Sequence, residues 1–468
     1  MGARPSGKNE GDTPTEKSTM STTLEQIDLA AKAFWAQHPT DRDAAFAVLR
    51  RENPVPWSRA PESDLLPPEL NTEGFWSLTK YEDIRYASRN PKIFSSAEGI
   101  TMETFDPMMT EAAQSFIAMD APRHTQLRGI TLDAFKPKNM RRLEDWIRGH
   151  ARDLVQEMAP KGEGDFVDMV SMHLPGRIFA SFFGIPDHLY DKTISAAQRL
   201  LAWSDPEACG DQTGLEMFAD CVIDLHSVAQ ELSEERRDNP GEDLFSWMLA
   251  AEWEGQKMTE DEICAFFVLL AVAANDTTRH SSAHAIRLFS ENPDQLALLQ
   301  EDMDGRIDGA IEEILRVASP LVHMRRTATE DVQIRDAQIK KGDKVVLWYC
   351  SGNRDEEVYE DPDRFDILRD PNRHVAFGGG GPHYCLGNAL GRTTLKSLIR
   401  EVYGTMPDIK AEEPDYQANN FINGIHRLQV RWTPPAAGTT AAAGTDETAT
   451  CPVPHGDAAG GACPAPSN

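Results

Sequence analysis

The sequence predicts a mainly α-helical protein with small β-sheets, folded as a single large domain. Three segments carry apolar side chains at i, i+3, i+4 and i+7, the spacing of an amphipathic helix, and they lie at 141–159, 261–290 and 308–319. Short runs typical of strands lie elsewhere in the chain, at 74–80, 331–336, 343–349 and 426–432. Because strands and helices do not alternate regularly, a doubly wound parallel sheet is not expected.

The two ends of the chain differ in composition from the middle. Residues 1–22 are polar and rich in Gly, Ser and Thr, and residues 433–468 are rich in Ala, Pro and Gly. Such segments cannot bury enough apolar surface to offset the entropy lost on ordering. We therefore expect one folded domain over 23–432, flanked by two disordered segments.

Net charge and hydropathy exclude several classes of partner. The 468 residues carry a formal net charge of -28, which disfavours binding to nucleic acid or to an anionic membrane surface. The chain has no long apolar run and no apolar signal core at its N-terminus, so we expect a cytoplasmic protein with no membrane span. The 7 cysteines form no CxxC pair, which disfavours a zinc site or a disulfide framework.

The segment HVAFGGGGPHYCLGNALGR, residues 374–392, combines four consecutive glycines with Cys385. Glycine permits positive φ angles and lets the backbone approach a bound group closely. The residues after Cys385 are expected to form a helix, and free N–H groups at a helix N-terminus favour a thiolate. A thiolate presented in this way suits axial ligation of haem iron. Taken alone, a free buried cysteine beside a flexible turn explains the segment equally well.

This segment resembles the proximal loop of the cytochrome P450 superfamily, FxxGxxxCxG, with one additional residue between the Phe and the Cys. A subset of actinobacterial members that hydroxylate methyl-branched lipids and sterol side chains is similar in this insertion. The resemblance implies a P450 fold that binds heme b (iron protoporphyrin IX), with Cys385 as the ligand of the metal. The loop residues that it assigns to cofactor binding are Phe377, Gly378, His383, Cys385 and Gly387.

The motif EILR places Glu313 and Arg316 three residues apart on one predicted helix. An isolated pair at this spacing is usually solvated and contributes only about 0.2–0.5 kcal/mol. Beside the cysteine loop, it resembles the buried Glu–Arg pair with which this family holds the segment before that loop. The resemblance makes Arg364 of DPDRF the third member of the group, with His374 as the alternative.

The segment AVAANDTTRH, residues 271–280, places Asp276 and Thr277 between apolar turns of the longest predicted helix. A buried Asp costs several kcal/mol unless it has a partner; alternatively, the helix emerges into solvent at Asn275. The segment resembles the family's (A/G)GxDTT motif, with Ala274 in place of the common glycine. The resemblance implies that Asp276 and Thr277 supply protons during oxygen activation, and that Ala273 lies against the haem.

The segment MDAPRHTQLRGI, residues 119–130, places His124 and Arg128 four residues apart, so both lie on one helical face and can hold an anion together. An ordinary basic pair on the surface is the alternative. The two residues resemble the family's haem-propionate clamp, with His383 and Arg326 on the other propionate. These motifs extend the resemblance over roughly residues 25 to 432.

Apolar residues near these motifs are predicted to line a substrate pocket, although core packing explains each of them equally well: Ile100, Met102, Phe105, Leu321, Val322, Phe421 and Ile422. Their lack of charge favours a long, uncharged or amphipathic substrate. The C-terminal motifs look most similar to the methyl-branched lipid ω-hydroxylases, with sterol side-chain 26/27-hydroxylases close behind. This implies a monooxygenase that uses O2 to hydroxylate the end of a methyl-branched lipid, isoprenoid or sterol side chain. A biosynthetic P450 acting on a terpenoid, steroid nucleus or macrolide would share every haem motif.

The chain has neither a GxGxxG dinucleotide loop nor a reductase-sized extension. Electrons from NAD(P)H are therefore expected through separate proteins, a ferredoxin and a ferredoxin reductase, as in similar bacterial enzymes. A locally basic stretch at 135–152 is the predicted dock for an acidic ferredoxin, and an ordinary solvated helix face is the alternative. Its basic residues are Lys136, Lys138, Arg141, Arg142, Arg148 and Arg152.

Overall fold

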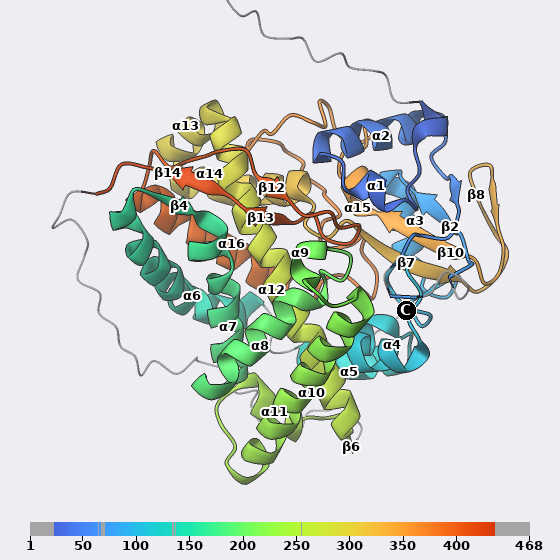
Figure 1. The fold of residues 1–468 in the computed structure, drawn as a ribbon, viewed down its shortest axis with the longest axis horizontal. Coiled ribbons are helices and arrows are strands. Elements are labelled where there is room, and N and C mark those ends of the chain that lie inside the picture. The colour runs from blue at the N-terminus through green and yellow to red at the C-terminus, as the bar shows by residue number, and fades with distance from the viewer. Residues whose placement is uncertain are drawn as a thin grey trace, which may run out of the picture.

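The computed structural model describes residues 23–63, 65–66, 71–132, 135, 137–253 and 255–435, without the side chains of 137–142. The fold is mainly helical with small sheets, as predicted (Figure 1). The segment 1–22 and nearly all of 433–468, both predicted to be disordered, lie outside the described residues. Thr433, which is described, donates a backbone hydrogen bond to Asp408 (3.1 Å).

Helices make up most of the described chain. They are α1 (Lys32–Trp35), α2 (Pro39–Glu52), α3 (Tyr81–Arg89), α4 (Pro107–Gln114), α5 (Arg123–Leu132), α6 (Pro137–Met158), α7 (His173–Phe183), α8 (Asp187–Leu200), α9 (Pro206–Cys209), α10 (Gly214–Asp238), α11 (Leu244–Ala250), α12 (Glu260–Glu291), α13 (Pro293–Glu301), α14 (Met303–Ala318), α15 (Tyr349–Gly352) and α16 (Asn388–Thr405). Short 3-10 or π turns are η1 (Leu24–Gln26), η2 (Ser115–Ala118), η3 (Ala159–Lys161) and η4 (Val167–Ser171).

The strands are short. They are β1 (Trp57–Ser58), β2 (Phe75–Leu78), β3 (Phe94–Ser95), β4 (Glu163–Asp165), β5 (Glu252–Trp253), β6 (Gln256–Lys257), β7 (His323–Ala328), β8 (Val332–Ile334), β9 (Ala337–Ile339), β10 (Lys344–Trp348), β11 (Lys410–Ala411), β12 (Asp415–Tyr416), β13 (Ile425–Arg427) and β14 (Gln429–Arg431). The predicted strand at 426–432 is two strands, because β13 pairs with β12 whereas β14 pairs with β4 and β11.

Helix α12 runs through the middle of the molecule (Figure 1) and matches the predicted helix at 261–290. It begins at a capping box, in which Thr259 accepts a hydrogen bond from the N–H of Glu262 and the Glu262 carboxylate accepts one from the N–H of Thr259. The helix ends before Asn292 and Pro293, since proline disfavours helical backbone at the residue before it. Most of its residues are buried, so it is a core helix.

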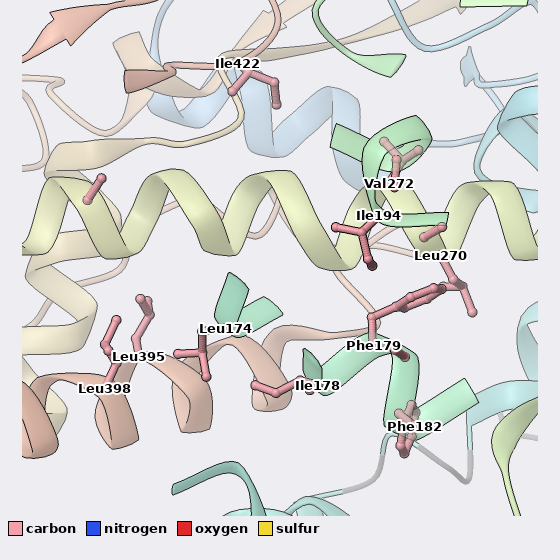
Figure 2. Close-up of a cluster of buried hydrophobic side chains, with 14 of the residues drawn as sticks. Leu174, Ile178, Phe179, Phe182, Ile194, Leu270, Val272, Leu395, Leu398 and Ile422 are labelled. Carbon is pink, nitrogen blue, oxygen red and sulfur yellow. The ribbon is translucent and has the colours of Figure 1, made fainter. Parts of the chain in front are cut away.

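Apolar side chains from α7, α12 and α16 meet in one cluster (Figure 2). Burying each large aliphatic or aromatic side chain contributes about 1.5–3 kcal/mol. The cluster therefore fixes α16, the helix that follows the cysteine loop, relative to α12. Its labelled members on these three helices are Leu174, Ile178, Phe179, Phe182, Leu270, Val272, Leu395 and Leu398.

A five-stranded sheet in the order β1-β2-β10-β7-β3 forms the other half of the fold. Its strand β10 is buried along its whole length. Because successive side chains of a strand point to opposite faces, Val345 and Leu347 pack into one apolar cluster, and Val346 and Trp348 pack into another. The sheet thereby separates two small cores, and its strand β7 carries Arg326.

Glu313 and Arg316 of α14 form a fully buried pair. The guanidinium donates to both carboxylate oxygens, each at 2.8 Å, and both side chains are 0% exposed. Arg316 also donates to the backbone carbonyls of Asn353 (2.9 Å) and Pro362 (2.7 Å). The pair therefore joins α14 to the chain that leads into the cysteine loop.

The third member of this group is Arg369 and not the predicted Arg364. The Nε of Arg369 lies 3.3 Å from the Glu313 carboxylate, which also accepts from Asn372 at 2.9 Å. Arg364 contributes only its backbone carbonyl, because Phe365 turns into the core and leaves the Arg364 side chain exposed.

The alternative third member, His374, bonds to a different carboxylate. Its Nε2 lies 3.0 Å from Glu312. His374 therefore supports the same segment through Glu312, the residue of α14 that precedes Glu313.

Replacing Arg369 by Gln is expected to lower the free energy of unfolding by about 3 kcal/mol, because a buried carboxylate loses a charged partner. Replacing Arg364 by Gln, the matched control, should change it by less than about 0.5 kcal/mol. Urea unfolding followed by far-UV circular dichroism measures both. Equal losses for the two variants would contradict the assignment of Arg369.

Candidate active site

The glycine-rich loop before Cys385 packs against the end of α3. Gly378 and Gly381 have φ angles of +97° and +77°, which favour glycine. A Cβ on Gly381 would lie 2.2 Å from the backbone oxygen of Ser88, so no other residue fits there. The N–H of Cys385 donates to the Phe377 carbonyl at 2.9 Å and closes the loop.

Cys385 lies just before α16, whose N-cap is Gly387, as the sequence predicts. Burial raises the pKa of the Cys385 thiol, whereas the N–H of Gly387 and the charges of Arg128 and Arg392 oppose that rise. A Cβ on Gly387 would meet nothing within 4 Å, so the backbone there is open to a bound group. A cation at the sulfur would favour its thiolate form.

A cavity separates the cysteine loop from α12. Cys385, Phe377, Gly378 and Gly387 line one side. The opposite wall includes, from α12, Leu269, Leu270, Ala273, Ala274 and Thr277. Phe116, Leu321 and Met324 also line it, which makes the walls mostly apolar.

Four basic side chains from separate segments gather at the edge of this cavity. His124 and Arg128 come from α5, Arg326 from β7 and His383 from the cysteine loop. The rings of His124 and His383 lie 4.2 Å apart. Arg128 donates to the backbone carbonyl of Tyr384, and Arg326 to that of Arg325.

No carboxylate forms an ion pair with Arg128 or Arg326 within the described part of the chain, and the buried Nε2 of His124 has no hydrogen-bond partner there. Burial and the neighbouring positive charges lower the pKa of His124 to about 4 and that of His383 to about 2. Buried cations without a counter-ion are costly. The cluster therefore fits a bound group with carboxylates, and the paired propionates of a haem meet that requirement.

Thr277 lies on the cavity wall, and its hydroxyl donates to the Ala273 carbonyl at 3.1 Å. Ala273 faces the same cavity. Asn275 is buried, with its amide donating to the Ala271 carbonyl at 2.6 Å, so the alternative that α12 emerges into solvent there is wrong. Bonds from polar side chains to carbonyls one turn earlier let α12 continue through this region.

Asp276 is buried beside Thr277 but does not line the cavity. Its side chain is 3% exposed, and its Oδ1 has no hydrogen-bond partner among the described residues. Burial raises the pKa of Asp276 to about 7, and the charge of Arg279 opposes that rise. Arg279 is itself buried, with Asp165 and Asp205 as further charged neighbours. A carboxyl group with this pKa can both take up and release a proton near neutral pH.

The predicted substrate residues are mostly not on the cavity wall. Leu321 is there, and Ile422 forms a β-bridge with it. Met102 and Val322 pack instead into the small core on one side of β10. Sequence could not reveal this, because Leu321 and Val322 are adjacent in the chain and point in different directions.

The remaining predicted residues are buried near the cavity without lining it. Phe105 stacks on Phe218 with ring centroids 4.9 Å apart and meets Trp203 edge to face. Phe421 lies against the other side of Trp203, at 6.0 Å. Ile100 is buried in the same large core. The rings of Phe105, Phe218, Trp203 and Phe421 thus pack together beside the cavity. The residues that line the cavity do not include Phe105, Phe421 or Ile100, so the prediction that these three contact substrate is not supported.

Two features near the cysteine loop were missed by the sequence analysis. Tyr349 lines the cavity close to Arg326, and pairing of β10 with β7 is the signal that would have placed it there. Glu312 binds Arg392 of α16 at 2.6 Å, and that guanidinium lies 4.4 Å from the centre of the Phe377 ring. The charged residues on α14 thus reach both sides of the loop.

The predicted ferredoxin dock lies along α6, which packs against α16. Lys136 lies outside the described residues, as do the side chains of Lys138, Arg141 and Arg142. Arg148 and Arg152 are described: both are about half exposed, and both bind Glu401 of α16, with nitrogen–oxygen distances of 2.5 and 3.4 Å.

Comparison with known proteins gives a consistent family assignment. The family model described as Cytochrome P450 matches residues 69–402. A methyl-branched lipid omega-hydroxylase of Mycobacterium tuberculosis is 40% identical over 414 residues, covering 88% of this chain and 95% of that protein. A steroid C26-monooxygenase of Mycolicibacterium smegmatis is 38% identical over 415 residues, covering 87% and 94%.

A solved structure also matches closely. It is a Mycobacterium marinum cytochrome P450 in complex with pseudoionone, with a TM-score of 0.84 and 40% identity, covering 87% of this chain and 98% of that one. None of the helices in the described ranges has both the length and the apolar character needed to cross a membrane.

Replacing Asp276 by Asn tests the protonation state of the Asp276 carboxyl group. Because its folded pKa of about 7 lies above the ordinary value of 3.8, the native state favours the protonated form. The wild type should therefore lose stability relative to D276N as pH rises, by about 3 kcal/mol between pH 5 and pH 8. Urea unfolding at both pH values measures this difference, with Asp41→Asn on exposed α2 as the control. A stability difference that does not change with pH would contradict the assignment.

Proposed function

Because this chain belongs to the cytochrome P450 family of monooxygenases, we propose that it hydroxylates the terminal carbon of a methyl-branched lipid, an isoprenoid or a sterol side chain. The observation that carries the proposal is similarity over nearly the whole domain to two relatives named for oxidation at a chain end. One is a methyl-branched lipid omega-hydroxylase at 40% identity, and the other is a steroid C26-monooxygenase at 38%. The complex of a third relative with pseudoionone, an isoprenoid ketone, supports the same class of substrate.

Heme b is the proposed cofactor, with Cys385 as its iron ligand. When bound, it would supply the oxidising power to insert one oxygen atom of O2 into a C–H bond. Arg128 and Arg326 would bind its propionates, since neither guanidinium has a carboxylate partner among the described residues, and the neutral rings of His124 and His383 would donate hydrogen bonds to them.

The proton supply is assigned to α12. The Thr277 hydroxyl faces the cavity, and Asp276 lies next to it in the chain with a raised pKa. Asp276 would hold a proton at its carboxyl group near neutral pH and release it toward the cavity, and Thr277 would position the last donor. Both roles rest on family resemblance together with this placement.

The apolar walls of the cavity would hold the substrate and exclude water. Phe116, Leu270, Leu321 and Met324 provide this surface without a charged side chain. A terminal methyl C–H bond is stronger than the neighbouring secondary ones, so attack at the chain end depends on position and not on intrinsic reactivity. Close packing around the last carbons is the proposed source of that selectivity.

A paired substrate screen tests the proposal. Holoenzyme with a surrogate ferredoxin system should convert a methyl-branched fatty acid mainly to its terminal alcohol, and a sterol with a side chain to a side-chain alcohol. A straight-chain acid of equal length and a steroid without a side chain are the matched controls, and both should be poorer substrates. Mass spectrometry of the products locates the hydroxyl group. Preferred attack on the steroid nucleus, or on a macrolide, would favour a biosynthetic role instead.

Replacing Leu321 by Ala should reduce the terminal fraction of product several-fold, because the widened cavity lets secondary carbons reach the oxidant. Leu368→Ala, at an exposed position, is the control and should leave the product ratio unchanged. An unchanged product ratio in Leu321→Ala would contradict the assigned role of this residue.

We further propose that electrons from NAD(P)H arrive through a ferredoxin and its reductase, with α6 as the ferredoxin dock. The packing of α6 on α16 supports this position, because α16 begins next to Cys385. Within this acidic chain, Arg148 and Arg152 offer a partly exposed basic surface there.

Reversing the charges of Arg141 and Arg142 to Glu should slow reduction by an acidic ferredoxin about tenfold or more at low salt, and the effect should shrink as salt is added. Stopped-flow reduction under carbon monoxide measures the rate. Arg51→Glu together with Arg431→Glu, two exposed positions outside α6, changes the net charge by the same amount and serves as the control. If the double variant is reduced at the wild-type rate, α6 is not the dock.

A further inference from the structure

A second cavity, of about 690 Å³, lies further along α12. The first cavity is lined by α12 residues from Leu269 to Ser281, whereas the second is lined by His284, Arg287, Leu288 and Glu291. Its wall also includes residues of α2, the end of α14 with the chain just after it, the segments at 350–365, and the C-terminal residues Glu413, Tyr416 and Asn423. No residue lines both cavities, so the second is a separate site.

Each carboxylate on this wall already bonds to a basic side chain, and for three of the four that side chain is an arginine. Arg354 binds Asp43 at 2.9 Å and Asp363 at 3.4 Å. Arg287 binds Glu291 at 2.7 Å. The fourth carboxylate, Glu413, lies 3.1 Å from Nε2 of His38. None of these acids forms a further ion pair on this wall among the described residues.

Two arginines on this wall have no carboxylate partner among the described residues, the exposed Arg364 and the buried Arg42. Arg42 lies on α2, lines the cavity and is only 5% exposed. Within the described residues it forms no ion pair. Its guanidinium donates only long hydrogen bonds, to the Trp35 carbonyl at 3.4 Å and to the Asn423 side-chain oxygen at 3.3 Å. Burial lowers the pKa of Arg42, and the nearby charge of Asp43 opposes that shift.

A buried guanidinium with weak neutral partners is a strong site for an anion, because it offers a fork of donors to two oxygens. The rest of the wall selects the kind of anion. Trp35, Phe46 and Val322 give it apolar surface, which favours an organic molecule. The four arginines on the wall balance its four carboxylates, so the wall has no excess positive charge to hold a multiply charged anion. An organic anion with one negative charge and a compact apolar part meets both conditions.

We propose that this second cavity binds an organic monocarboxylate whose carboxylate pairs with Arg42. Such a ligand replaces the two long hydrogen bonds of the guanidinium with a charged pair. Asn423, one of the present partners, also donates to the Ala318 carbonyl at 2.7 Å and accepts from His284 at 3.0 Å, so it stays anchored when Arg42 turns to a ligand. The site is independent of the substrate assigned to the haem cavity.

The test uses haem-loaded protein saturated with a tight azole ligand, so that the haem cavity is closed to acids. Isothermal titration with benzoate should give saturable binding to one site in the wild type. Benzamide, which has the same shape without the charge, should not bind. Replacing Arg42 by Gln should weaken benzoate binding at least about tenfold. Arg51→Gln, on the same helix but exposed, should bind benzoate as the wild type does.

Three outcomes would overturn the proposal: no saturable binding of benzoate, equal binding of benzamide, or equal binding to R42Q. Phosphate binding as tight as that of benzoate would overturn the choice of an organic monocarboxylate. If R42Q does not fold with haem, hydrogen exchange measured on the wild type with and without benzoate tests the proposal instead. Benzoate must then slow exchange in α2 and in residues 284–292, and unchanged exchange in both segments rejects the site.

Discussion

The position of the cysteine depends on two adjacent carboxylates of α14. Glu313 holds Arg316 and Arg369, so it fixes the chain that leads into the glycine-rich loop. Glu312 binds His374, at the start of that segment, and Arg392, one turn into α16. The loop is therefore supported on both its sides by neighbouring residues of one helix. Glu313 and Arg316 are fully buried, so losing one partner would leave the other charge buried without a counter-ion, whereas Glu312 and Arg392 are partly exposed.

The buried polar side chains of α12 are of two kinds, because some have hydrogen-bond partners and others lack them. Asn275 and Thr277 satisfy their side chains on carbonyls of the preceding turn, so they interrupt neither the helix nor its packing. Asp276 and Arg279 lie among these residues without comparable partners. Unsatisfied buried groups of this kind are rare in structural cores and concentrate at functional sites. Arg42 differs from the other arginines around the second cavity in being buried without an ion pair among the described residues.

Local spacing was enough to predict the mainly helical class, the helices α6, α12, α14 and α16, and the parts of the site that lie in one segment. The period of 261–290 predicted α12, and the glycines around Cys385 predicted a bend before a helix. Arg369 was missed because the chain between Asp361 and Asp370 is irregular, and only its turns decide which arginine faces Glu313. Met102 and Val322 were misplaced for a related reason, since apolar character does not reveal which side of a sheet receives a side chain. Four residues of the site, His124, Arg128, Arg326 and His383, come from three segments that lie far apart in the sequence. Local spacing could not bring them together, and resemblance to the family supplied that prediction.

The close contact between Gly381 and the Ser88 carbonyl joins parts of the chain that are almost 300 residues apart in sequence. The support for the sulfur thus includes a helix that is synthesised almost 300 residues before the cysteine itself. Neither part can form the completed loop alone. Cofactor capture in the cell must therefore follow synthesis of nearly the whole domain, and a nascent chain released before α16 would have no means of retaining porphyrin.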